Sequence, residues 1–123
     1  MPRYRGLTLR VLGKGPPAMG PGKAELIERI AKTGSISAAA RAMGMSYRRA
    51  WQLVEALNNT YSEPVIATAV GGRRGGGASV TAFGRRLTAQ FRAMEAKAAA
   101  AIAADLRRFT KHLRVSAKRR KSY

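Results

Sequence analysis

The segment from Gly34 to Leu57 constrains the fold most, because it predicts two short helices separated by a tight turn. The first helix is expected to end at Gly44, since glycine readily adopts the left-handed conformation that closes a helix. Small residues fill this helix: Ala38, Ala39, Ala40 and Ala42. Small side chains let two helix backbones approach closely where they cross at a steep angle. The pattern therefore predicts two helices packed across each other.

Three serines lie where the amide groups at the starts of these helices need a partner. Ser35 or Ser37 can cap the first helix and Ser46 the second, because a serine oxygen accepts hydrogen bonds from first-turn amides. A phosphate group can bind at the same helix ends. Capping alone explains all three residues, so both roles stay open at this point.

The second helix, expected over residues 46–59, has two different faces. At about 100° per residue, one side collects the apolar residues Ala50, Val54 and Leu57. The opposite side carries side chains that donate hydrogen bonds, namely Arg48, Arg49 and Gln52. Trp51 lies at the edge of the apolar face, where packing explains it better than contact with a ligand. The segment is typical of a helix-turn-helix with a basic outer surface.

Two apolar, partly β-branched segments follow, over residues 65–70 and 78–81, with a glycine-rich stretch between them. Strand, glycine-rich turn and strand predict a β-hairpin. A hairpin directly after a helix-turn-helix is what a wing looks like. Arg73 and Arg74 lie at its tip, where glycines let the backbone approach a phosphate chain. A solvated loop is the alternative explanation for this tip.

A long apolar stripe marks the C-terminal third of the chain. Thr81 is expected to cap a helix that opens at Phe83 and continues to Phe109, about 40 Å at a rise of 1.5 Å per residue. The stripe consists of Leu87, Phe91, Met94, Ala98, Ile102 and Leu106. A small domain has little core to cover it, so its far half predicts a dimerisation surface. The alternative is that the helix packs back on its own domain.

Before the helix-turn-helix, Leu7, Leu9 and Val11 alternate with other residues and predict a short strand. A helix is expected from about residue 23 to 32. The expected fold class is mainly α with a small β-hairpin: a winged helix-turn-helix plus a long C-terminal dimerisation helix. Residues 1–110 are expected to form this domain and residues 111–123 a basic flexible tail.

The charge balance points to a polyanionic partner. The chain has 24 Lys and Arg against 6 Asp and Glu, a formal net charge of +18. Fourteen of the basic residues and all 6 acidic ones lie between Pro16 and Thr110, so the expected folded part is basic in its own right. Such an excess indicates a nucleic-acid partner more than a surface tuned for solubility.

Double-stranded DNA is the expected partner, because a recognition helix needs donors for base edges and positive charges for phosphates. The predicted DNA-contacting residues are Ser35, Ser37, Ser46, Tyr47, Arg48, Arg49, Gln52, Arg73 and Arg74. The function predicted is a sequence-specific transcriptional regulator that binds as a homodimer. The alternative is a nucleoid-associated or RNA-binding structural protein that uses its charge without reading bases.

Other classes find little support in the residues. The chain has a single histidine, His112, and no cysteine, and its acidic residues are scattered, so neither an enzyme nor a metal or cofactor site is expected. The loop from Gly71 to Gly77 lacks the Gly-Lys-Ser/Thr ending of a phosphate-binding loop. No small-molecule pocket can be argued from sequence. No apolar run reaches membrane-spanning length, and a cytoplasmic location is expected.

Four segments together resemble a known family: residues 33–40, 44–51, 71–78 and 80–87 are similar to the N-terminal DNA-binding domain of the molybdate-responsive transcriptional regulators (ModE), which is LysR-like. The resemblance implies a winged helix-turn-helix homodimer, paired through its long last helix, on an operator with two related half-sites. In the full-length family a second region of small β-barrels binds molybdate or tungstate. No counterpart follows the long helix here, so molybdate binding is not expected.

Overall fold

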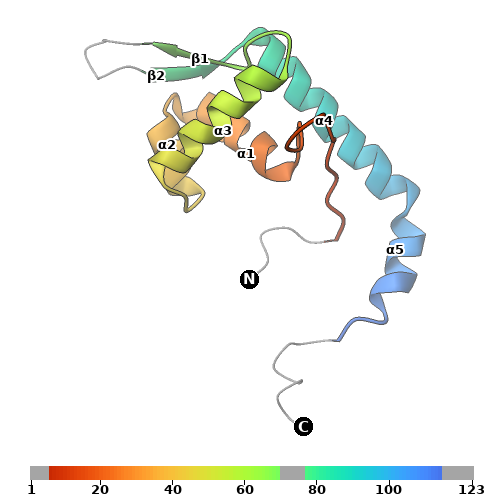
Figure 1. Cartoon of the computed structure of the whole chain (residues 1–123). Coiled ribbons are helices and arrows are strands. Elements are labelled where there is room, and N and C mark those ends of the chain that lie inside the picture. Colours follow the sequence, from red (N-terminus) through yellow and green to blue (C-terminus); the bar gives the residue numbers. More distant parts are fainter. Residues whose placement is uncertain (1–5, 70–76, 115–123) are drawn as a thin grey trace.

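The computed structural model describes residues 6–69 and 77–114 (Figure 1). Three helices come first, then a two-stranded hairpin, then two more helices that lead away from the body. The elements are α1 (Pro21–Thr33), α2 (Ile36–Ala42), α3 (Tyr47–Thr60), β1 (Ile66–Ala69), β2 (Gly77–Val80), α4 (Ala82–Ala101) and α5 (Ala103–Thr110). This architecture confirms the expected mainly α winged helix-turn-helix.

The core lies where α1, α2 and α3 meet. The apolar faces of these helices supply its buried side chains, which include Leu26, Ile27, Ile30, Val54 and Leu57. Ala39 and Ala40 of α2 are also buried, and α2 packs between α1 and α3. Ala39 and Ala40 thus lie where the helices approach closely, as their small size predicts, whereas Ala38 is half-buried and Ala42 is exposed and does not lie in the helix contact.

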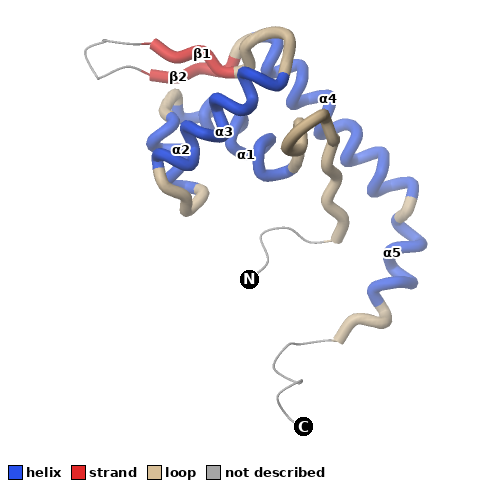
Figure 2. Tube along the Cα trace, viewed as in Figure 1, coloured by secondary structure: helices blue, strands red, loops and turns tan. Residues whose placement is uncertain are grey.

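The wing is an antiparallel pair of strands that extends from the body (Figure 2). Ile66 lies opposite Val80 at its base, and Ala69 lies opposite Gly77 at the far end of the described strands. The base is fixed by burial, because both Ile66 and Val80 belong to the core. Arg73 and Arg74 lie outside the described residues.

The start of α4 packs tightly against the base of the wing. Thr81 caps α4 as expected, since its hydroxyl accepts a hydrogen bond from the amide of Gly84 at 2.9 Å and donates to the carbonyl of Pro64. A Cβ atom at position 84 would lie 2.5 Å from the carbonyl oxygen of Val65. Glycine is therefore required at position 84 by the close approach of α4 to Val65, just before β1, and to Val80 of β2.

Two expectations need correction. Residues 7–11 form no strand in the described part of the chain, and only Val11 makes an isolated bridge, to Met19. The last helix is not continuous to Phe109, because it is interrupted at Ile102, where φ is −111° and ψ is 12°. The surrounding alanines favour helix, so propensity does not explain the interruption. Beyond this interruption α5 continues away from the body, and Leu106 lies beside Gly6 of the N-terminal segment.

Candidate nucleic-acid interface

The two helices of the helix-turn-helix begin at serine caps. The Ser35 hydroxyl accepts from the amide of Ala38, and the Ser46 hydroxyl accepts from the amide of Arg49, both at 3.0 Å. Of the two candidates for the first cap, Ser35 is therefore the one that acts. The Ser37 hydroxyl instead accepts from the guanidinium of Arg41 at 3.2 Å.

The outer face of α3 is exposed and polar. Ala50, Val54 and Leu57 are buried, which fixes the rotation of the helix and leaves Arg48, Arg49 and Gln52 exposed. Neither Arg48 nor Gln52 makes a side-chain hydrogen bond or an ion pair within the described parts of the chain. Side chains whose donors are free in this way can contact an external acceptor.

Two aromatic residues lie on the flank of α3. The rings of Tyr47 and Trp51 meet edge to face, with centroids 6.2 Å apart and planes at 80°. Trp51 is half-buried against the core, as predicted, whereas Tyr47 is 53% exposed. The indole therefore supports the phenol ring in a fixed position on the surface at the start of the helix.

Asn58 joins α3 to the wing, a role that its sequence position does not reveal. Its side-chain oxygen accepts from the amides of Val65 and Ile66 at 2.8 and 3.0 Å, and its side-chain nitrogen donates to the carbonyl of Ile66. The first residues of β1 are thus bound to the same helix that exposes Arg48. The wing and α3 are held in one fixed arrangement.

A second connection joins the wing to the turn before α2. The amide of Ala78 in β2 donates to the carbonyl of Gly34 at 3.0 Å. Gly34 has φ of +70°, a conformation that favours glycine and ends α1. The residue that closes α1 also anchors β2, so the start of α2 and the wing share one support.

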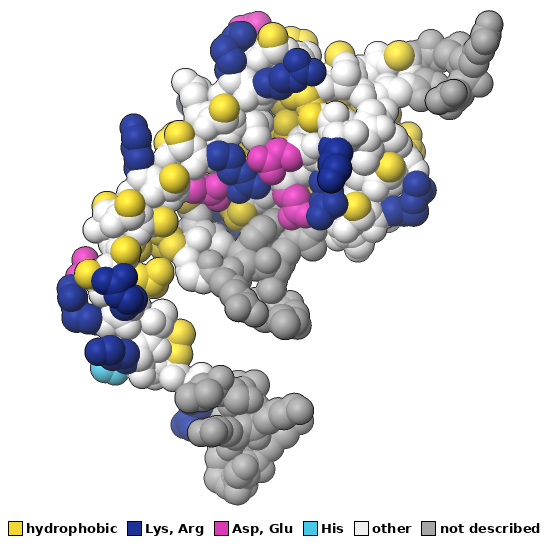
Figure 3. Space-filling view, turned by 180° about the vertical axis from the view of Figure 1, so that it is seen from behind, with side chains coloured by type: hydrophobic (Ala, Val, Ile, Leu, Met, Phe, Trp, Pro, Cys, Tyr) yellow, Lys and Arg dark blue, Asp and Glu magenta, His cyan; other side chains and the backbone are white. Residues whose placement is uncertain are grey.

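Two carboxylates, Glu28 and Glu95, lie beside the same cation on another surface of the molecule. Figure 3, seen from behind, shows Asp and Glu side chains beside Lys and Arg over the middle of the molecule. Glu28 of α1 accepts from Arg92 of α4 at 2.8 Å, and Glu95 accepts from the same guanidinium at 2.7 Å. The hydrogen bond to Glu28 is the main cause that raises the pKa of the Arg92 guanidinium, and the hydrogen bond to Glu95 raises it further. Arg92 is thus paired with two carboxylates, whereas Arg48 forms no ion pair within residues 6–69 and 77–114.

The residues predicted for dimerisation do not share one environment. Phe91 is only 3% exposed and lies in the core of its own chain, and Leu87 packs partly against that core. Met94 is 44% exposed, and Ala98, Ile102 and Leu106 are half-buried. The stripe therefore begins inside the domain and leaves it along the second half of α4.

No group of acidic residues or histidine suited to hold a metal ion occurs in residues 6–69 and 77–114. Within the same ranges, no helix is both long and apolar enough to cross a membrane.

Fold and surface define a winged helix-turn-helix protein. Residues 22–85 match the family described as bacterial regulatory helix-turn-helix protein, lysR family. The match covers more than half of the chain, which therefore belongs to this family.

Several molybdenum-related proteins are similar to this chain. It is 46% identical to the molybdenum-pterin-binding protein MopB of Rhodobacter capsulatus over 92 residues, 75% of this chain and 33% of the relative. It is 40% identical to the molybdenum transport protein ModE of Azotobacter vinelandii over 78 residues, which are 63% of this chain and 29% of that relative. It is 39% identical to the DNA-binding transcriptional dual regulator ModE of Escherichia coli over 67 residues, which are 54% of this chain and 26% of that relative.

These matches confirm the resemblance to the ModE family. The chain spans about a third or less of the length of these relatives.

Proposed function

We propose that the protein binds DNA sequence-specifically as a homodimer and regulates transcription, with α3 in the major groove. The observation that carries this proposal is the outer face of α3, where Arg48 and Gln52 are exposed and free of side-chain partners. Arginine donates two hydrogen bonds to guanine, and glutamine pairs with adenine through its amide. Tyr47 at the start of the helix contacts a thymine methyl group or the sugar-phosphate backbone.

The remaining DNA contacts are assigned to serines at the helix starts, to Arg49 and to the loop between β1 and β2. Ser35, Ser37 and Ser46 lie at helix starts, where hydroxyl and amide groups bind phosphate oxygens. Arg49 completes the basic surface of α3. Arg73 and Arg74, from the loop between β1 and β2, are assigned to the flanking backbone or minor groove. Asn58 and Gly34 support this arrangement, because they bind the wing to α3 and to the start of α2.

The dimer is assigned to the second half of α4 together with α5. Met94, Ile102 and Leu106 supply the apolar surface, and the intervening alanines let a second helix approach closely. Phe91 and Leu87 support this surface from inside the domain. A symmetric dimer places two copies of α3 on half-sites about 10 base pairs apart, or a multiple of that distance.

We further propose that residues 1–110 form the DNA-binding unit, since α5 ends at Thr110, and that the basic residues 111–123 add affinity without specificity. We also propose that the protein acts in the cytoplasm, where bacterial chromosomal DNA lies, and that it is a binding protein without catalytic activity.

DNA binding by these 123 residues is proposed to need no molybdate. Trp51 is the single tryptophan and lies on α3, so its fluorescence reports on this helix. We expect no saturable change when molybdate is added, with or without a DNA duplex. A saturable response specific to molybdate or tungstate contradicts this part of the proposal.

The alternative is a structural nucleic-acid-binding protein that neutralises phosphates without reading bases. Selection from a pool of random duplexes at physiological salt separates the two. We expect enrichment of two related half-sites, in inverted orientation. A pool that stays random after selection, while binding still weakens with salt, supports the alternative.

A further inference from the structure

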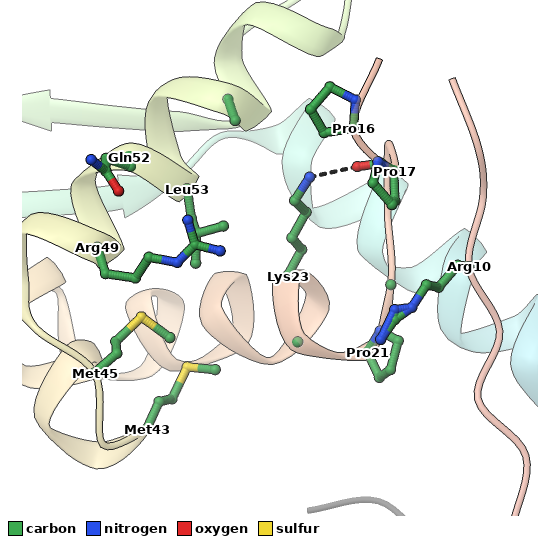
Figure 4. A pocket seen from close by; sticks show the side chains of 13 residues that line it. Arg10, Pro16, Pro17, Pro21, Lys23, Met43, Met45, Arg49, Gln52 and Leu53 are labelled. Atoms are coloured by element: carbon green, nitrogen blue, oxygen red, sulfur yellow. Dashed lines mark hydrogen bonds between the residues drawn. The ribbon is translucent and has the colours of Figure 1, made fainter. Parts of the chain in front are cut away.

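A cavity of about 510 Å³ lies between α3 and the start of α1 (Figure 4). Ligand sites for small molecules commonly have volumes of about 300–1,000 Å³. No motif indicates this cavity, because its walls come from segments that are far apart in the chain.

Most of the cavity wall is apolar. Prolines form rigid walls on the side of α1, and methionines, whose flexible thioethers adapt to a ligand's shape, line the side of the turn before α3. The apolar lining includes Pro16, Pro17, Pro21, Met43, Met45 and Leu53. A surface of this kind suits a ring or a short hydrocarbon body.

Three cations border the same cavity: Arg10, Lys23 and Arg49. Arg49 extends from α3 into the cavity, and Lys23 stands on α1 and donates to the carbonyl of Pro17 (Figure 4). Within residues 6–69 and 77–114, no carboxylate forms an ion pair with any of the three. Within the described residues, the positive charge at this cavity is therefore not paired with a carboxylate.

The electrostatics of Lys23 agree with this geometry. Burial lowers the pKa of its ammonium group, and the positive charge of Arg49 lowers it further. An anion placed between the two side chains offsets their repulsion and the cost of burying the ammonium group.

We propose that this cavity binds a small organic anion with an apolar body, of the class of aromatic carboxylates. The carboxylate lies between Lys23 and Arg49, and the ring lies on the proline and methionine wall. A bare inorganic anion leaves that wall in contact with water, and a neutral aromatic leaves the cations unmatched. Only a ligand with both parts uses the whole cavity.

Occupancy has a consequence for DNA binding, and this consequence rests on the proposed function. Arg49 and Gln52 line the cavity and also belong to the surface assigned to DNA. A bound carboxylate neutralises Arg49 and holds its side chain away from a phosphate. The ligand therefore weakens DNA binding.

The test uses the full chain, labelled with ¹⁵N, without DNA. Benzoate is the probe, benzamide keeps the ring without the charge, and inorganic phosphate keeps charge without the ring. We expect benzoate to give saturable amide shifts confined to residues such as Gly22, Met45 and Leu53, with binding at least about fivefold tighter than that of the other two probes. Shifts spread over all basic surfaces overturn the proposal. Phosphate binding as tightly as benzoate overturns it too, and identifies a DNA phosphate as the occupant.

Two variants locate the binding. Lys23→Gln removes one cation and should weaken benzoate about fivefold, whereas Lys32→Gln, which removes an exposed cation elsewhere on α1, should leave it unchanged. Equal effects of the two overturn the site. Ala56→Phe fills the cavity from α3 and should abolish the confined shifts without changing the charge.

DNA readouts separate this inference from the proposed function. Benzoate should weaken binding of a selected duplex to the wild type, and less so to Lys23→Gln. A protein that binds benzoate in the cavity but binds no DNA contradicts the proposed function and leaves the site standing. A protein that binds DNA but gives no confined benzoate shifts overturns the site alone.

Discussion

Helix α3 and the C-terminal end of the molecule differ in how many contacts within the chain fix their positions. Helix α3 buries Ala50, Val54 and Leu57, starts at the Ser46 cap and is bound to the wing through Asn58. Helix α5 buries no residue, starts without a side-chain cap, and leaves Phe109 66% exposed. An isolated helix of 8 residues is marginal in water. Contacts within the chain thus fix the first region, and we expect the second to depend on a partner for its shape.

The largest expected effect concerns the join between the wing and α4. Gly84→Ala places a Cβ 2.5 Å from the Val65 carbonyl oxygen and 2.9 Å from Cγ1 of Val80, so backbone must move. We expect a loss of about 3 kcal/mol in the free energy of unfolding, measured by urea denaturation. Gly15→Ala is the matched control, since its Cβ meets no atom within 4 Å. Equal stability of the two variants refutes the close approach.

A substitution at the C-terminal end of the molecule should weaken the association of two subunits and leave the folding of the monomer unchanged. Ile102→Asp places a charge in the apolar stripe, and we expect the dimer dissociation constant to rise about a hundredfold. Sedimentation equilibrium measures this constant, and thermal unfolding of the monomer should be unchanged. Ala96→Asp adds the same charge at an exposed position of α4 and should leave the dimer intact. If the wild-type protein is monomeric even at high concentration, the prediction that α5 depends on a partner is wrong.

Loss of the link between α3 and β1 has a smaller effect. Asn58→Ala leaves the amides of Val65 and Ile66 without their acceptor, and we expect a loss of about 2 kcal/mol in unfolding free energy. The neighbouring Asn59→Ala is exposed and should change stability by less than about 0.5 kcal/mol. Hydrogen exchange should also show faster exchange in β1 of the Asn58 variant alone. Similar exchange in both variants means that the side chain does not hold the wing.

The smallest expected effects on the free energy of unfolding come from two sets of ion pairs, those of Arg92 in the body and that of Arg108 in α5. Arg92→Ala breaks contacts between α1 and α4 and should cost about 0.5–1 kcal/mol, reduced by the partial exposure of these groups. Arg108→Ala breaks a more exposed pair with Asp105 inside α5 and should cost about 0.3 kcal/mol or less. Unfolding at low and high salt checks both, since screening should shrink the Arg92 effect. A larger loss for Arg108 contradicts the difference between the regions.

Local features of the fold could be predicted from the sequence. Ser46 and Thr81 cap helices where the spacing of apolar residues places the helix starts, and Val54 and Leu57 are buried as the helical period requires. These features depend on residues that are near one another in the chain. Caps and periodicity therefore predicted the helix starts to within a few residues, together with the outer face of α3, but not the end of α4.

Features that depend on distant segments could not be predicted. Phe91 fits the apolar stripe equally well inside or outside the domain, and only packing against the first helices decides between the two. Nothing in an alanine-rich run marks the interruption at Ile102. The cavity beside Arg49 exists only because α1 places Lys23 opposite α3, and the two residues are far apart in the sequence. Asn58 has no local signal, because its hydrogen-bond partners are set by the path of the chain after α3.

The central claim is that α3 reads base pairs, and it is tested most directly by a scan of single base-pair substitutions in a selected duplex at constant salt. Affinities are measured for the wild type, Arg48→Ala and, as a charge-matched control, Lys97→Ala. We predict that Arg48→Ala loses about 1–3 kcal/mol of discrimination at one position of each half-site and keeps it elsewhere, while Lys97→Ala keeps it everywhere. If Arg48→Ala instead weakens binding equally on every duplex, the residue contacts phosphate and the claim fails.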